Sequence, residues 1–142
     1  MKFWDSSAVV PLLVDEPSTP AVSALRDNDP TMLVWWATEV DCVSAISRLE
    51  RNADLNPDAT TASLARLDAL IATWAQILPT HTVRQVARRM LRVHDLRASD
   101  ALQVAAATVA AEGHPASLEF VSLDDRLVAA ARREGFAIAA VG

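Results

Sequence analysis

The sequence predicts an α/β protein in which helices cover both faces of a mainly parallel sheet. Short apolar segments, at residues 1–4, 32–35 and 120–123, alternate with longer segments that have a helical pattern. Buried strands that alternate with helices are typical of parallel sheets. Because 142 residues suit one domain with one core, we expect a single domain over residues 1–142.

The first half of the chain is predicted to hold two strands and four helices. Ser6 or Ser7 is expected to cap the first helix, which tolerates Pro11 near its first turn. Thr19-Pro20 supplies a cap and a first helical residue for the second helix, and Thr38 is expected to cap the third. The strands are expected at 1–4 and 32–35, the helices at 8–14, 19–25, 38–49 and 59–71, and a loop at 52–58.

The second half is predicted to hold three strands and three helices. Segment 82–94 has the clearest helical pattern, because its apolar residues share one face at about 100° per residue. A helix rich in alanine begins near Ala98, and the helix at 125–133 ends before Gly135, a residue suited to the C′ position. The strands are expected at 75–78, 120–123 and 136–141.

Composition excludes several classes of protein. No apolar stretch is long enough to span a membrane, and early acids argue against a signal peptide. Cys42 is the only cysteine, so an internal disulfide is impossible and a cytoplasmic location fits best. Lys2 is the only lysine, which excludes mechanisms that need a lysine deep in the fold. The formal net charge of −5 argues only weakly against nucleic-acid binding, because a divalent metal reverses the local field of gathered acids.

Four acids lie at or near predicted junctions between strands and helices: Asp5, Glu39, Asp100 and Asp124. Sites in parallel sheets gather at the C-terminal ends of strands, and Asp5 and Asp124 both follow a strand. Two carboxylates about 4 Å apart repel by about 4 kcal/mol in a protein environment, so such a cluster needs a cation, a shared proton or nearby bases. Oxygen ligands favour Mg²⁺ or Mn²⁺ over zinc, and such ions support phosphodiester hydrolysis.

Each acid also has a structural interpretation. Asp5 competes with two serines for the role of helix cap, and because the serines can cap without charge, a functional role is favoured. Glu39 is explained equally well by the dipole at a helix N-terminus. Asp41 resembles a capping-box partner and is interpreted as structural. Asp124 is expected to face the site, and Asp125 to start the following helix.

Arginines form a stripe on the predicted helix at 82–94. Arg84, Arg88 and Arg92 share one face, and Arg97 continues the series toward Asp100. A solvated helix face and a surface that contacts RNA phosphates explain the stripe equally well.

Four motifs, in order along nearly the whole chain, resemble those of PIN-domain nucleases. The third is the most specific match, and the size of the chain resembles that of VapC toxins from toxin–antitoxin pairs. The motifs are Phe3-Trp4-Asp5-Ser6-Ser7-Ala8, then Thr38-Glu39-Val40 with Ser44-Ala45-Ile46-Ser47-Arg48, then Leu96-Arg97-Ala98-Ser99-Asp100-Ala101-Leu102-Gln103-Val104-Ala105, and Val121-Ser122-Leu123-Asp124-Asp125-Arg126-Leu127.

The resemblance implies a PIN-like three-layer α/β/α sandwich with endoribonuclease activity that depends on Mg²⁺ or Mn²⁺. Carried over by position, Asp5 and Asp100 are the main metal ligands, and Glu39 and Asp124 complete the pocket. Ser122 is expected to orient the first aspartate, with Ser6 in support. The implied partners are an RNA substrate, a VapB-like antitoxin whose tail blocks the acidic groove, and a second copy of the chain in a homodimer.

Two rival functions are weaker. A phospho-receiver or aspartyl-phosphate enzyme also places an aspartate after the first strand. Receivers need a late lysine, which is missing, and the phosphatases pair acids two residues apart, where this chain has Ser7. A PIN-like fold that only binds RNA or a partner is the second rival. Loss of an acid would favour it, and none is lost.

Overall fold

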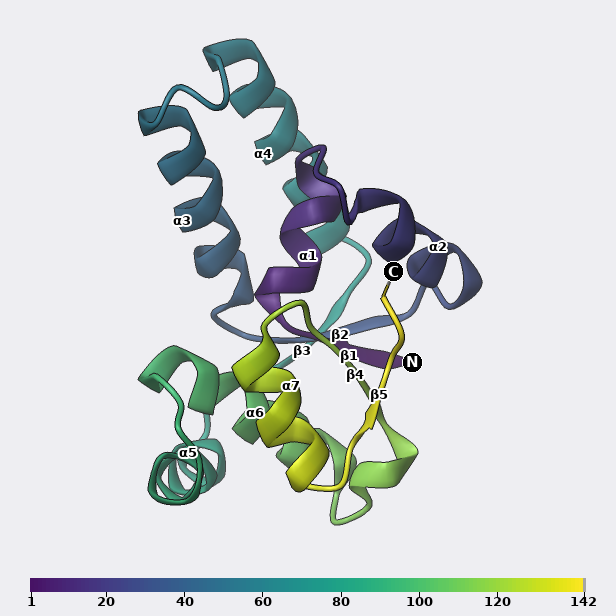
Figure 1. Ribbon diagram of the computed structural model, residues 1–142, viewed down its shortest axis with the longest axis vertical. Helices are drawn as coiled ribbons and strands as arrows, with labels where there is room; N and C mark the ends of the chain where they lie inside the picture. Colours follow the sequence, from purple (N-terminus) through teal and green to yellow (C-terminus); the bar gives the residue numbers. More distant parts are fainter. Residues whose placement is uncertain (142) are drawn as a thin grey trace.

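The computed structural model of the chain describes residues 1–141, and its centre is a parallel sheet. The strands of this part of the chain are β1 (Lys2–Trp4), β2 (Met32–Trp35), β3 (Ala75–Ile77), β4 (Glu119–Val121) and β5 (Ala137–Ile138). They lie in the order β3-β2-β1-β4-β5, and every pair is parallel (Figure 1). The predicted parallel sheet is therefore confirmed, although the last strand is much shorter than the expected 136–141.

Helices cover both faces of the sheet, which confirms the predicted α/β/α sandwich (Figure 1). Within the described residues, the core clusters assign four helices to one face and three to the other. The first group is α1 (Ser6–Leu13), α2 (Thr19–Asn28), α3 (Thr38–Arg51) and α4 (Pro57–Ile71), and the second is α5 (His81–Val93), α6 (Ala98–Ala111) and α7 (Asp125–Arg133), with a 3₁₀ turn at Pro115–Ser117. No helix within residues 1–141 has the length and apolar character needed to cross a membrane.

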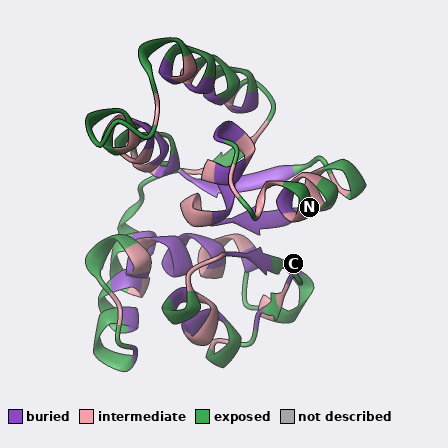
Figure 2. Cartoon of the chain, turned by 45° about the horizontal axis from the view of Figure 1, so that its top comes forward, coloured by how far each residue is buried: buried purple, intermediate pink, exposed green. Residues whose placement is uncertain are grey.

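Side chains that alternate along the strands contribute to both layers of the core. Phe3 stacks on Phe120 at a ring-centroid distance of 5.4 Å on the side of α6, whereas Trp4 belongs to the cluster on the side of α1. Successive residues of a strand point to opposite faces, so β1 contributes to both layers. Figure 2 shows the buried central strands of the sheet and the exposed outer faces of the helices.

The strand order puts a topological switch point at β1. The chain moves from β1 to β2 on one side and later returns to β4 on the other side. Ligand sites in open parallel sheets form at such a point, beyond the C-terminal ends of the strands. Trp4 is paired with Val121, and the amide nitrogen of Asp5 donates to the carbonyl of Val121 at 3.0 Å. The residues that follow β1 and β4 are therefore neighbours.

The predicted cap of α1 is wrong. Asp5 is the N-cap, and its carboxylate accepts a hydrogen bond from the amide nitrogen of Ser7 at 3.3 Å. The helix therefore starts at Ser6, two residues earlier than expected, and Pro11 lies in its second turn. A proline there removes one backbone hydrogen bond, which leaves the Ser7 carbonyl without its usual partner.

The predicted caps of α2 and α3 are also wrong. Ser18 precedes α2, and the Thr19 hydroxyl instead donates toward carbonyls at the end of α1, at 2.7 Å from Pro11 O and 3.1 Å from Val14 O. Ala37 precedes α3 without a side-chain cap, and Thr38 is buried with its hydroxyl facing α6. Both threonines connect elements to one another, which a local sequence pattern does not reveal.

Other expectations are confirmed. The helix α7 has the predicted bounds, and Gly135 follows it with a φ of +98°, in the left-handed region that favours glycine. The buried residues of α5 are Val83, Ala87 and Met90, which belong to the predicted apolar face.

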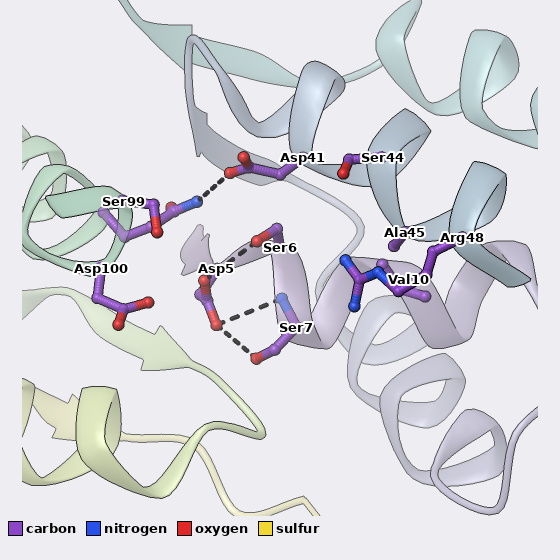
Figure 3. Close-up of a pocket in the computed structure, with 11 residues that line it drawn as sticks. Asp5, Ser6, Ser7, Val10, Asp41, Ser44, Ala45, Arg48, Ser99 and Asp100 are labelled. Carbon is purple, nitrogen blue, oxygen red and sulfur yellow. Dashed lines mark hydrogen bonds between the residues drawn. The ribbon is translucent and has the colours of Figure 1, made fainter. Parts of the chain in front are cut away.

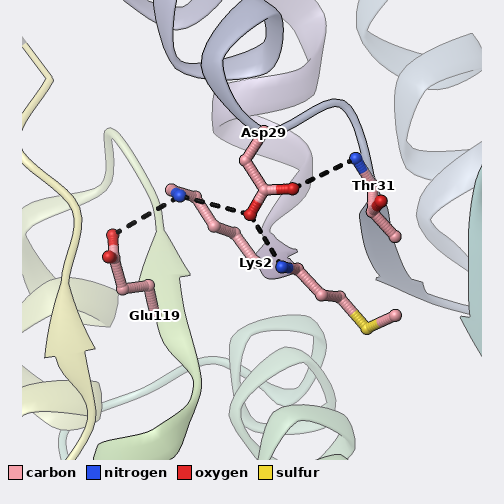
Figure 4. A network of polar contacts seen from close by, with 5 residues as sticks. Lys2, Asp29, Thr31 and Glu119 are labelled. Carbon is pink, nitrogen blue, oxygen red and sulfur yellow. Dashed lines mark hydrogen bonds and ion pairs between the residues drawn. The ribbon is translucent and has the colours of Figure 1, made fainter.

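Lys2 lies at the N-terminal end of β1, away from the switch point. Its Nζ is 3.4 Å from Asp29 Oδ2 and 4.0 Å from Glu119 Oε2, and the amino group of Met1 donates to the same Asp29 oxygen at 2.7 Å (Figure 4). These ion pairs connect β1 to the residues that precede β2 and to β4. The single lysine therefore has a structural position at the opposite end of the strand from the switch point.

Candidate functional site

An acidic cavity of about 310 Å³ lies beyond the C-terminal end of β1, between α1, α3 and α6 (Figure 3). Asp5, Asp41 and Asp100 supply its carboxylates, each from a different segment of the chain. The remaining lining is mostly small or polar: Ser6, Ser7, Val10, Ser44, Ala45, Arg48, Ser99 and Gln103.

Asp5 is the most buried of these acids, with 3% of its surface exposed. Burial raises its pKa from 3.8 to about 6, although hydrogen bonds from Ser7 and Ser122 oppose the shift, and the charge of Asp124 adds to it. Its recorded hydrogen-bond partners within residues 1–141 are hydroxyls and one backbone amide, and none is a cation. A bound cation would therefore stabilise the ionised form of Asp5.

Two serines hold the Asp5 carboxylate in place. Ser122 Oγ donates to Asp5 Oδ2 at 2.8 Å, the contact that the resemblance implied, and the Ser7 hydroxyl donates to the same oxygen. Ser6 is a weaker partner, with its hydroxyl 3.5 Å from the carboxylate. Ser7 also accepts from the amide nitrogen of Leu123 at 2.9 Å. This network joins the end of β4 to the start of α1, and Ser7 has a larger part in it than the sequence indicated.

Asp100 lies in the first turn of α6 and is about half-buried. Burial raises its pKa, and the charge of Asp124 raises it further, while the backbone hydrogen bond from Arg97 and the charges of Arg97 and Arg126 lower it. The bond from the Arg97 amide to Asp100 Oδ2 is long, at 3.4 Å. The carboxylate therefore combines a weak capping contact with a position on the cavity wall.

Asp41 is the acid that sequence reasoning placed outside the site. It lines the cavity, and its Oδ2 accepts a hydrogen bond from Gln103 Nε2 at 3.3 Å. Burial raises its pKa, the Gln103 hydrogen bond opposes this, and the charge of Asp100 adds to it. No side-chain cap is present at the start of α3, so the capping-box interpretation of Asp41 is wrong.

Glu39 is exposed and does not line the cavity. On a helix, Asp41, Ser44, Ala45 and Arg48 form one stripe, because they are spaced three or four residues apart. Glu39 lies on the opposite side of α3 from this stripe. The small residues Ser44 and Ala45 are a signal in the sequence that could have identified the cavity face, and with it Asp41.

Asp124 lies beside the cavity in an adjoining hollow of about 280 Å³, which shares Ser99 and Asp100 with it. It caps α7, accepting from the amide nitrogens of Arg126 at 2.9 Å and Leu127 at 3.2 Å. Asp125 is the first residue of α7, as predicted, and lines the same hollow. Asp124 therefore acts on the acidic cavity through its charge, not as part of its wall.

The arginines separate into two groups. Arg84, Arg88 and Arg92 are exposed on α5 and line neither the acidic cavity nor the adjoining hollow. Arg97 lines the hollow, and Arg48, which was not predicted as a site residue, lines the acidic cavity. The cations next to the acids are thus Arg48, Arg97 and Arg126, while the α5 stripe belongs to a separate surface.

The donor set of the cavity fits a hydrated Mg²⁺ or Mn²⁺ ion. Within residues 1–141, no three His, Cys, Asp or Glu side chains lie close enough together to hold an ion as a preformed cage. Mg²⁺ usually retains several waters and is held by one or two carboxylates, so a full cage is not required. Asp5, Asp41 and Asp100 offer only hard oxygen donors, in a cavity large enough for an ion with its waters.

Comparison with known proteins shows similarity at the level of fold. No family model and no curated protein matches the sequence. A chain in the crystal structure of FitAcB from Neisseria gonorrhoeae matches with a TM-score of 0.66 and 17% identity, over 97% of this chain and 96% of that one. A chain in the structure of FitAB bound to an IR36 DNA fragment matches with a TM-score of 0.66 and 16% identity, over 98% and 94%. At these identities the likeness establishes the shared fold.

Proposed function

We propose that this protein is a metal-dependent endoribonuclease that hydrolyses RNA phosphodiester bonds with Mg²⁺ or Mn²⁺. The observation that carries the proposal is the convergence of Asp5, Asp41 and Asp100 on one cavity beyond β1. The raised pKa values of these acids support it, because a site that disfavours carboxylate charge gains most from a cation.

The charged residues of the cavity and the serines that hold Asp5 each have a proposed part. Asp5 and Asp100 hold the ion, which when bound activates water and offsets the charge that develops on the phosphate. Asp41 helps to complete the metal pocket, which is the part that the resemblance implied for Glu39. Ser122 and Ser7 fix the Asp5 carboxylate through the hydrogen bonds described above. Arg48 lines the same cavity and is the proposed contact for a substrate phosphate.

The biological role that fits best is the toxin of a toxin–antitoxin pair. The four PIN-like motifs support this role, as does the fold shared with a chain in FitAcB and in FitAB, the latter bound to a DNA fragment. We propose a VapB-like antitoxin as the partner that blocks the acidic cavity, a homodimer as the assembly, and the cytoplasm as the location. Arg84, Arg88, Arg92 and Arg97 remain proposed contacts for the rest of the RNA.

Cleavage of a structured RNA pool tests the proposal directly. The purified protein is assayed with Mn²⁺, Mg²⁺ or EDTA beside Asp5→Asn and Asp100→Asn, with Asp68→Asn on the exposed face of α4 as a matched control. Cleavage that needs metal, is lost in both site variants and persists in the control is the expected result. Intact RNA under all conditions, together with no metal binding in calorimetry, would overturn the catalytic proposal.

A second candidate is a non-catalytic PIN-like module that binds RNA or a partner. The observation that favours it is the absence, within residues 1–141, of a three-acid group close enough to cage an ion. RNA binding in EDTA without turnover in Mn²⁺ would support this function over the first.

A further inference from the structure

A buried glutamine lies against the acidic cavity, and the proposed function does not use it. Gln103 is 2% exposed and lines the cavity together with Asp41 and Asp100. It follows Asp100 by three residues on α6, so both side chains leave the helix on neighbouring parts of one face. Glutamine is mostly found at protein surfaces, so a buried one beside three carboxylates needs a reason.

The amide of Gln103 is oriented by what it contacts. Its Nε2 lies 3.3 Å from Asp41 Oδ2 and 3.3 Å from Thr38 Oγ1, both on α3. An ionised carboxylate can accept hydrogen bonds but cannot donate them. The amide nitrogen of Gln103, and not its oxygen, must therefore face Asp41. Gln103 Oε1 is then left buried, with no hydrogen-bond partner among residues 1–141.

A purely structural role explains only part of this arrangement. A glutamine that merely joined α6 to α3 needs the Thr38 contact alone, and an apolar side chain would pack there without leaving a buried oxygen unpaired. Contact with Asp41 gives the glutamine a second effect, because it fixes one oxygen of that carboxylate. The amide also stabilises the charged form of Asp41 against burial.

We propose that Gln103 is a positioning residue of the acidic cavity, which holds the Asp41 carboxylate in the orientation used to bind a hydrated divalent cation. The inference rests on the proposed function, because it counts Asp41 among the groups that hold the ion. Partners that orient a metal-binding carboxylate in this way typically change metal affinity by about 10–100-fold when they are removed.

A double-mutant cycle on Mn²⁺ affinity tests the proposal, with binding measured by calorimetry on the full chain. Gln103→Leu is expected to weaken Mn²⁺ binding by about 10-fold or more. The same substitution in an Asp41→Asn background is expected to cause no further loss, because the two effects share one carboxylate. Thr38→Val is the matched control, since it removes the other contact of Gln103 Nε2 and should leave the affinity within about twofold.

Two further measurements keep the result decisive. Gln103→Met preserves the length of the side chain and is measured in parallel, so that the inference can still be tested if the leucine variant does not fold. Circular dichroism confirms that each variant is folded. Wild-type affinity in both Gln103 variants, or losses that add in the cycle, would overturn the inference while the proposed function stands. A wild-type protein that binds no Mn²⁺ would instead overturn both.

Discussion

Replacing Asp5 by asparagine should stabilise the fold at neutral pH while abolishing metal binding. Burial raises the pKa of Asp5 from 3.8 to about 6, a difference of roughly two units, which corresponds to about 3 kcal/mol of folding free energy. Asparagine is similar in shape and carries no charge. Its amide can retain hydrogen bonds with Ser7 and Ser122, so most of this cost should disappear in the variant.

The direction of the pH dependence follows from which state holds the proton. The unfolded chain ionises Asp5 near its ordinary pKa of 3.8, whereas the native protein retains the proton up to about pH 6. Between these values the native state binds more protons, so the free energy of unfolding contributed by Asp5 falls as the pH rises. The advantage of Asp5→Asn should therefore be near zero at pH 3.5 and reach about 3 kcal/mol at pH 8.

Urea unfolding in EDTA measures this difference, with the fluorescence of the buried Trp4 and Trp35 as the signal. The variant and the wild type are compared at pH 3.5 and pH 8, with Asp68→Asn as a control expected to stay within about 0.5 kcal/mol of wild type. Adding Mn²⁺ at pH 8 should stabilise the wild type and not the variant. No gain at pH 8, or the same gain at both pH values, would refute the assignment of Asp5 as an acid strained by burial.

Three further predictions follow from the same structure. Asp41→Asn should weaken Mn²⁺ binding and RNA cleavage by about 10-fold or more, whereas Glu39→Gln, on the opposite side of α3, should stay within about twofold; equal losses would contradict the assignment of the cavity face. Gly135→Ala should cost about 1–3 kcal/mol in urea unfolding because φ is +98°, and an unchanged midpoint would contradict this. Burial opposes the ionised form of Glu134, but hydrogen bonds from Arg89 at 2.9 Å and His94 at 2.6 Å outweigh it and lower the pKa. Glu134→Gln should therefore destabilise by about 1–3 kcal/mol at pH 7 and progressively less as the pH falls below about 4; a loss independent of pH would exclude the charge as its cause.

The sheet and most helices could be predicted because local periodicity determines them. The helix at 125–133 is bounded by an aspartate cap and a C′ glycine, both local signals, and its observed bounds agree with the prediction. The last strand was overestimated for a reason that is not local. A strand extends only where a neighbour offers paired backbone groups, and β4, its neighbour, is three residues long. The length of an apolar run such as 136–141 is therefore only an upper limit on the length of the strand.

Asp41, the acid that α3 contributes to the cavity, could also have been identified from local periodicity. This required comparing the faces of the helix instead of matching a short motif. Matching Thr38-Glu39-Val40 to a family pattern selected the acid next to a presumed cap. The helical phase of Ser44, Ala45 and Arg48 selects Asp41 instead, and the cavity lining agrees with the phase. What the sequence could not supply was the partner of that acid, because Gln103 lies 62 residues away on another helix.

From the sequence, each acid was given either a capping role or a functional role. In this fold, one acid can have both roles. Asp5 caps α1, Asp124 caps α7, and Asp41 and Asp100 lie in the first turns of α3 and α6. The positive ends of these helices stabilise nearby carboxylates by about 0.3–1 kcal/mol each. That is less than the net cost of about 3 kcal/mol that corresponds to the pKa shift of Asp5, so the helix ends reduce the strain on the acids without removing it. The remaining strain is what a divalent cation can relieve, and an acid can therefore start a helix and bind a metal through the same carboxylate.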